Sequence, residues 1–167
     1  MLMNEHSFHQ QSGLSLIESL IALVIISIGL LGIAALQLTS MQQSASAHWH
    51  SQAVWYSYEM TDRISANNID PANPVVFNQY IGIDTENNYN MDCQANACTA
   101  AQMVQADAAD WSAMISTLPG GRGVISSPAA NTLQISVMWD DNAGVSNCTN
   151  GEPGAADKTC YTVTVTP

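Results

Sequence analysis

A run of 25 almost wholly apolar residues lies near the start of the chain: LSLIESLIALVIISIGLLGIAALQL, residues 14–38. A helix rises about 1.5 Å per residue, so this run would extend over about 37 Å, enough to cross the hydrocarbon core of a bilayer. One charge interrupts it, Glu18, which is the only acidic residue between Glu5 and Glu59. Because a carboxylate within hydrocarbon costs about 2.5 to 3.5 kcal/mol, Glu18 either lies at the headgroup level or has a specific role.

The segment before this run is short and polar, with the sequence MLMNEHSFHQQSG at residues 1–13. It contains no Lys or Arg. A cleavable secretory signal has a basic start, a shorter apolar core and a cleavage site after that core. The order found here indicates a different kind of processing signal.

The string Gly13-Leu14-Ser15-Leu16-Ile17-Glu18, followed directly by the apolar run, resembles the class III signal of type IV pilins and type II secretion pseudopilins. This resemblance implies that a prepilin peptidase cleaves after Gly13 and that the new N-terminal residue, Leu14, is methylated. It also implies that Glu18 serves assembly, by neutralising the α-amino group of a neighbouring subunit. A buried pair of that kind sets register more reliably than it adds stability.

The same resemblance divides the chain into three parts. Residues 1–13 form the leader peptide, residues 14–40 the transmembrane and assembly half of the N-terminal helix, and residues 41–167 a periplasmic head. The implied fold class is α+β, a pilin-like fold. In it a long N-terminal α-helix packs on a C-terminal antiparallel β-sheet with a short second helix.

Periodicity extends the N-terminal helix beyond the apolar run. Apolar side chains recur every three or four residues at Ala45, Trp49, Ala53, Tyr56, Met60 and Ile64. This stripe predicts one helix from about residue 14 to residue 66, ending ahead of Pro71. Its first half is apolar and its second half amphipathic. Within the first half, Gly29 and Gly32 indicate either a local bend or close approach of another helix.

Shorter signals place the remaining elements. Val75-Val76-Phe77 is a strand candidate, and Thr99 with Gln102 matches a capping box that opens a helix ending at Leu118-Pro119-Gly120. Residues 120–123 predict a tight turn. Alternating apolar residues predict two half-buried strands, one with Leu133, Ile135, Val137 and Trp139 facing inward and one with Tyr161, Val163 and Val165.

Charge and cysteine content limit the function and the compartment. Three basic residues against 14 acidic ones give a net charge of −11, which disfavours binding to nucleic acid. The four cysteines form two local pairs, and disulfides Cys93–Cys98 and Cys148–Cys160 are the local solution among three possible connectivities. Structural zinc and free thiols are the alternatives. Disulfides predict an oxidising compartment such as the bacterial periplasm.

The residues show no arrangement typical of an active site, so we expect no enzymatic activity, no cofactor and no metal site. Asp140, Asp141 and Asp157 form either a solvated acidic loop or a calcium site, although their spacing matches no known calcium loop.

A closer resemblance, to the minor pilin group called PilV (type IV pilus modification proteins), rests on five stretches that make up three features: the start of the apolar run, the middle of the chain and a strand end. These are residues 15–23, Gly-Leu-Leu-Gly at 29–32, Asp110-Trp111 with Leu-Pro-Gly-Gly-Arg-Gly at 118–123, and Val-Met-Trp-Asp at 137–140. The resemblance implies a minor subunit that supports pilus assembly, initiation or tip presentation, and so twitching motility and adhesion.

The implied partners are the prepilin peptidase, other major and minor pilins, the inner-membrane assembly platform and, as a further candidate, a tip adhesin. The implied location is the inner membrane with a periplasmic head before assembly, and the extracellular pilus afterwards. Two alternatives remain at this stage: a type II secretion pseudopilin, and a membrane-anchored periplasmic binding module that does not polymerise.

Overall fold

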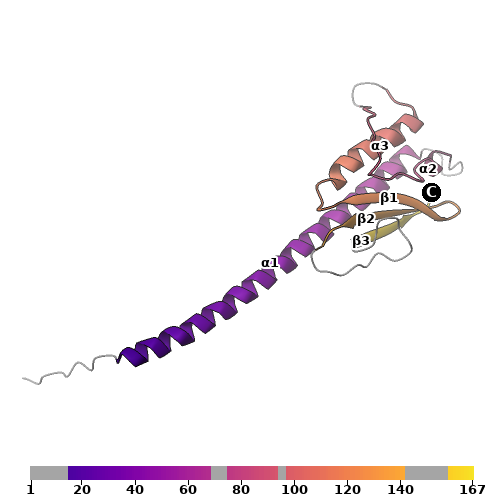
Figure 1. The fold of residues 1–167 in the computed structure, drawn as a ribbon. Coiled ribbons are helices and arrows are strands. Elements are labelled where there is room, and N and C mark those ends of the chain that lie inside the picture. The colour runs from indigo at the N-terminus through magenta and orange to yellow at the C-terminus, as the bar shows by residue number, and fades with distance from the viewer. Residues whose placement is uncertain (1–14, 69–74, 94–96, 142–157) are drawn as a thin grey trace, which may run out of the picture. The chain divides into compact units, whose positions relative to one another are not determined.

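The computed structural model describes residues 15–68, 75–93, 97–141 and 158–167, and its elements follow the order of an α+β chain (Figure 1). They are α1 (Leu16–Asn67), α2 (Val75–Asn78), α3 (Ala100–Ile115), β1 (Arg122–Ala129), β2 (Thr132–Trp139) and β3 (Thr159–Val165). The long helix, the short helix and the antiparallel sheet confirm the predicted fold class. The chain divides into two compact units, residues 1–43 and residues 44–167.

In the first unit, helix α1 is uninterrupted through both of its glycines. A Cβ added to Gly29 or Gly32 would meet no atom within 4 Å. The described part of this chain therefore shows neither a break at the glycines nor a helix packed on them. Close approach by a helix of another molecule is the alternative that stays a prediction.

In the second unit, which we call the head (residues 44–167), α1 buries one face. The buried residues are Ala53, Tyr56, Ser57, Met60 and Ile64, while Trp49 is half-buried and Ala45 is exposed. The predicted stripe is thus confirmed from Trp49 onward. Its spacing of three and four residues places these side chains on one side of the helix.

Helix α3 begins as predicted. The Thr99 side chain accepts a hydrogen bond from the Gln102 backbone N–H, and the Gln102 side chain accepts one from the Thr99 backbone N–H, which completes the capping box. Its face carrying Val104, Ala108, Trp111 and Ile115 is buried. The indole N–H of Trp111 donates to the Tyr56 carbonyl at 3.1 Å and so connects α3 to α1.

The sheet has three antiparallel strands in the order β1-β2-β3. Strands β2 and β3 match the two predicted strands, whereas β1 was not predicted. The prediction of a tight turn over residues 120–123 is wrong at its end, because β1 already begins at Arg122. Gly123 lies in this strand, and the position requires glycine because a Cβ there would overlap the ring of Trp111.

A single core joins the inner face of the sheet to the helices. It contains Ile125 of β1, Leu133, Ile135, Val137 and Trp139 of β2, Val165 of β3, and the buried faces of α1 and α3. The prediction of a half-buried strand is wrong at this end of β2, because Ser136 and Met138, which alternate with the inward residues, are also fully buried. Met138 packs with Val124 and Cys160 in a second, smaller cluster, so this end of β2 is covered on both faces.

The predicted strand at Val75-Val76-Phe77 is also wrong, because residues 75–78 form the short helix α2. A helical turn places Phe77 and Tyr80, three residues apart, on the same side of the chain. Both side chains are buried in the core at no more than 1% exposure. An extended strand would have directed them to opposite faces.

Candidate assembly site

The candidate assembly site begins at the first turn of α1. The backbone N–H groups of Glu18 and Ser19 donate to the Ser15 carbonyl at 3.0 and 3.2 Å. Glu18 is the acidic residue of this turn, where the exposed N–H groups of a helix favour negative charge, and it is exposed. Gly13 and Leu14, the predicted cleavage site, lie outside the described residues.

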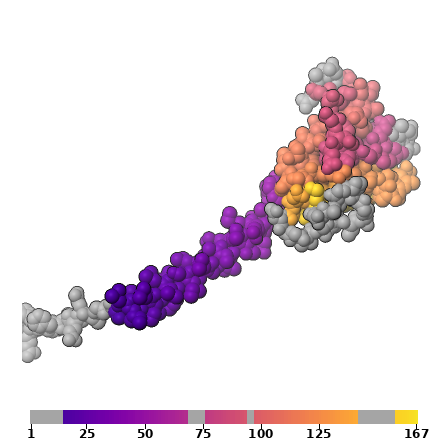
Figure 2. Space-filling model, viewed as in Figure 1, coloured from indigo at the N-terminus to yellow at the C-terminus, as the bar shows by residue number. Residues whose placement is uncertain are grey.

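The apolar half of α1 has no buried residue. Its large hydrophobic side chains from Leu16 to Met41 are 54–84% exposed (Figure 2). The helix is long and apolar enough to cross a membrane, and its most apolar window has a mean hydropathy of 2.7. Within that half, the hydroxyl groups of Ser27 and Thr39 donate to the carbonyls four residues earlier. Their polarity is therefore satisfied inside the helix.

Full burial of one large aliphatic side chain is worth about 1.5 to 3 kcal/mol. A helix with such side chains on every face is stable only when lipid or other protein surrounds it. Nothing in the described part of this chain does so. The cover for this half of α1 must therefore come from a bilayer or from other molecules.

Comparison with known families agrees with this geometry. The family model of the prokaryotic N-terminal methylation motif matches residues 8–34. The match supports a prepilin of the pilin or pseudopilin type. Such a motif implies processing by prepilin peptidase and assembly with other pilins, and with the apolar helix it indicates membrane anchoring. No curated protein and no solved structure matches the chain.

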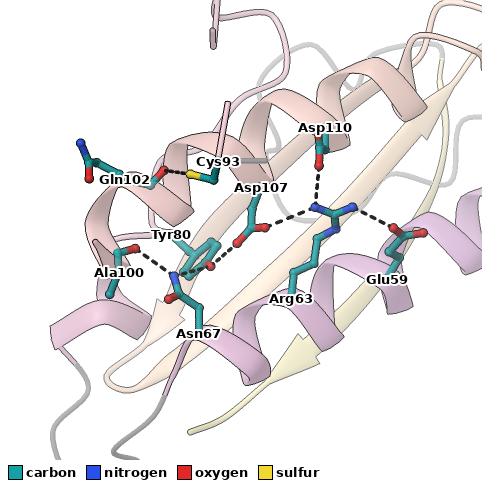
Figure 3. Close-up of polar contacts among 9 residues, drawn as sticks. All are labelled: Glu59, Arg63, Asn67, Tyr80, Cys93, Ala100, Gln102, Asp107 and Asp110. Atoms are coloured by element: carbon teal, nitrogen blue, oxygen red, sulfur yellow. Dashed lines mark hydrogen bonds and ion pairs between the residues drawn. The ribbon is translucent and has the colours of Figure 1, made fainter. Parts of the chain in front are cut away.

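An ion network centred on Arg63 of α1 connects two helices of the head (Figure 3). Its guanidinium donates to Glu59 at 3.0 Å on the same helix, and to Asp107 at 3.3 Å and Asp110 at 2.9 Å on α3. Of the three carboxylates, only that of Asp107 is buried, at 7% exposure. The network therefore connects the two helices with one cation and three anions.

Asp107 extends this network into the core. Its carboxylate accepts a 2.6 Å hydrogen bond from the hydroxyl of Tyr80, which in turn accepts one from the Asn67 side-chain amide at 3.0 Å (Figure 3). The Asn67 amide also donates to the Ala100 carbonyl at the start of α3. Burial, and then the bond to Asp107, raise the pKa of Tyr80 well above its ordinary value, so Tyr80 stays a donor.

The other two cations are also paired. Arg122 at the start of β1 contacts Asp84 at 2.6 Å and Glu86 at 3.4 Å, and Lys158 before β3 contacts Asp140 at 2.8 Å. Burial of Asp84 acts to raise its pKa, but the bonds from Arg122 and from the Glu86 backbone outweigh it, so the pKa of Asp84 lies below its ordinary value. Every Lys and Arg of the chain is thus engaged with a carboxylate.

The cysteines are oxidised where the structure describes them. Cys93 and Cys98 form a disulfide with a Cα–Cα distance of 5.6 Å just before α3. Cys160, on β3, is disulfide-bonded, while Cys148 lies outside the described residues.

The candidate calcium ligands have other partners where the structure describes them. Asp140 pairs with Lys158, and Asp141 accepts a 2.6 Å hydrogen bond from Ser46, while Asp157 lies outside the described residues. The described residues contain no group of three potential metal ligands.

Sequence reasoning missed the Arg63 network and the exposed Trp55. The spacing of Glu59 and Arg63, four residues apart on a helix, was the available signal for the first. Trp55 lies outside the apolar stripe that contains Ala53 and Tyr56, which already predicts that it faces away from the core. Tyr80 and Asp107 carry no local signal, because their contact joins segments 27 residues apart.

Proposed function

We propose that this chain is a minor pilin of a type IV pilus, similar to the PilV group, and that it supports pilus assembly, initiation or tip presentation. The observation that carries the proposal is the apolar half of α1. That half is exposed on all sides, lies largely within the matched methylation motif at residues 8–34 and contains a single carboxylate. Such a helix is suited first to a bilayer and then to a bundle of similar helices.

In this proposal the prepilin peptidase cleaves after Gly13 and Leu14 becomes the methylated N-terminus. The exposed carboxylate of Glu18 then pairs with the α-amino group of a neighbouring subunit inside the apolar bundle. A charge pair surrounded by apolar side chains is costly to break, so it selects one axial offset between subunits. The protein acts without catalysis and without a cofactor, through its position in the filament.

A type II secretion pseudopilin is the second candidate, because the matched motif at residues 8–34 is common to pilins and pseudopilins. The PilV-like stretches favour the pilus. Loss of surface pili and twitching after deletion of the gene, with unchanged protein secretion, would select the pilus. The opposite pattern would select the secretion system, and retention of residues 1–13 would select a non-polymerising membrane-anchored module.

The Glu18→Ala variant tests the pairing directly, with Ser19→Ala as its matched control on the same helical turn. We expect both variants to be cleaved and to fold their heads, since both residues belong to the first compact unit, residues 1–43. Removing one partner of a buried pair costs about 3 to 5 kcal/mol, so Glu18→Ala should reduce the amount in sheared filaments at least about tenfold. Equal amounts of the two variants in sheared filaments would refute the pairing.

A further inference from the structure

The outward face of α1 in the head carries an aromatic and acidic patch, formed by Trp55, Tyr58, Glu59 and Asp62. Neighbouring members of the patch are three or four residues apart, so their side chains form a continuous strip along the helix, with Trp55 and Asp62 at its two ends. Trp55 is 60% exposed and Tyr58 is 50% exposed, although large aromatic side chains usually contribute to a core. No other large hydrophobic side chain of α1 in the head is as exposed.

The patch is rigidly placed. On one side, a side-chain hydrogen bond joins Tyr58 to Tyr161 of β3 and contributes to a raised pKa of Tyr161. On the other side, Glu59 is held by Arg63 at 3.0 Å. The indole of Trp55 contacts the ring of Tyr56, whose own side chain is buried, with a centroid distance of 5.5 Å. A surface held at both sides needs little reordering when a partner binds.

The patch is acidic, and no unengaged cation lies in it. Asp62 is exposed and has no hydrogen bond or ion pair among the described residues. The positive charge of Arg63 is already shared by Glu59, Asp107 and Asp110. Trp55 and Tyr58 present aromatic faces, which attract cations, next to carboxylates that attract them further.

We infer that this patch is a docking site for a basic segment of a different protein, with one Arg or Lys side chain stacked on Trp55 and a second paired with Asp62. A second copy of this chain is a poor occupant, because all three of its Lys and Arg side chains are engaged in ion pairs within the head. An anionic bilayer surface is disfavoured by the net charge of −11. The chemistry thus favours a hetero-oligomeric contact.

This inference rests on the proposed function in one respect: it describes the chemistry of a protein that would lie next to this subunit in a filament. Its test needs neither cleavage nor filaments, so the two can fail separately. The probe is a fluorescein-labelled nona-arginine peptide, added to the full chain in a non-ionic detergent at 0.15 M salt. Fluorescence anisotropy of the peptide gives the dissociation constant.

Matched variants distinguish binding of the peptide to the patch from its attraction to the overall negative charge of the protein. Asp62→Asn and Glu86→Gln each remove one exposed negative charge, and only the first lies in the patch. Trp55→Ala and Ile81→Ala each remove an exposed hydrophobic side chain, and again only the first lies in the patch. We expect Trp55→Ala and Asp62→Asn each to weaken binding about two- to fivefold relative to their controls, and Trp55→Phe to recover part of the loss.

Three results would overturn the inference. The first is equal affinity for the peptide in the patch variants and their matched controls. The second is a Trp55-dependent dimer in sedimentation experiments without peptide, which would make a second copy the occupant. The third is Trp55-dependent binding to phosphatidylcholine vesicles combined with no binding to the peptide.

Discussion

The two halves of α1 are both rich in apolar residues, and their surroundings differ completely. From Leu16 to Met41 every large hydrophobic side chain is 54–84% exposed, whereas Met60 and Ile64 in the head are fully buried. In the first half apolar residues lie on all faces of the helix, and in the second the buried apolar residues lie on one face. Apolar content alone therefore does not say what covers a helix. The periodicity does, because a single apolar stripe is typical of a helix packed on its own domain.

The comparison predicts that truncations to alanine have unequal effects in the head and in the apolar half of α1. Trp111→Ala removes a fully buried ring of the core and the hydrogen bond to the Tyr56 carbonyl, so it should destabilise the head by about 3 to 5 kcal/mol. Leu30→Ala, at a side chain 62% exposed, should change the free energy of unfolding of the head by less than about 0.5 kcal/mol. Denaturant titration of the detergent-solubilised chain, followed by near-ultraviolet circular dichroism, measures both. Similar losses would contradict the separation of the two halves.

Sequence periodicity was sufficient to predict the secondary structure wherever a helix or strand is long and regular. The stripe from Trp49 to Ile64, the capping box at Thr99 and the alternation in β3 each arise from local spacing, and the structure confirms each. In β2 the alternation holds only as far as Ile135, beyond which both faces are buried. These signals work because one face of the element is buried and the other is solvated.

The errors occurred where tertiary contacts outweigh local preference. Val75-Val76-Phe77 favours a strand by composition, yet it forms a helical turn that buries Phe77 and Tyr80 together. Strand β1 contains only two buried apolar residues, Val124 and Ile125, between residues typical of turns, and its Gly123 is required by the ring of Trp111 rather than by a turn. No local pattern contains that information.

The functional residues, too, divide into those that the sequence predicts and those that only the structure reveals. The motif around Gly13 and Glu18 is contiguous, so the sequence alone revealed it. The Arg63 network and the exposed face at Trp55 depend on which helix packs against which, and only the structure places Asp107 beside Arg63.

Removing the disulfide of Cys160 on β3 tests how much this bond contributes to the stability of the head. We predict that Cys148 and Cys160 are bridged and that replacing both by Ser lowers the stability of the head by about 2 to 4 kcal/mol, since the bridge closes a long polar segment. Replacing Cys93 and Cys98 should cost less, because their ring is shorter. Thermal unfolding measures the two double variants, and non-reducing peptide mapping determines the connectivity. A bridge from Cys148 to Cys93 or Cys98 would refute the local pairing.

Two carboxylates of one network allow a finer comparison within the head. Asp107→Asn weakens the buried contacts to Arg63 and Tyr80, and we expect a loss of about 1 to 3 kcal/mol. Asp110→Asn breaks a pair whose carboxylate is 53% exposed, and the loss should not exceed about 1 kcal/mol. Chemical denaturation of both variants gives the difference. A larger loss of stability for Asp110→Asn would mean that the burial of a carboxylate does not determine how much its contacts contribute.

The smallest predicted effect is a pH dependence from Asp84. Its pKa in the folded protein lies below the value of about 3.9 in the unfolded chain. Its contribution to stability is therefore fully present above about pH 4 and is lost as the pH falls through the folded pKa. The Asp84→Asn variant should be slightly less stable than the parent at pH 7, with the gap closing towards pH 2. A gap that stays constant from pH 7 to pH 2 would show that the ion pair with Arg122 does not cause it.

The most direct test of the central claim, that the chain is a prepilin whose apolar helix is released for assembly, is the intact mass of the membrane-extracted protein. We predict that cells containing prepilin peptidase yield a chain that begins at Leu14 and carries one methyl group on its N-terminus, while cells lacking the peptidase yield a chain that still begins at Met1. An N-terminus that remains at Met1 in peptidase-competent cells would contradict the account.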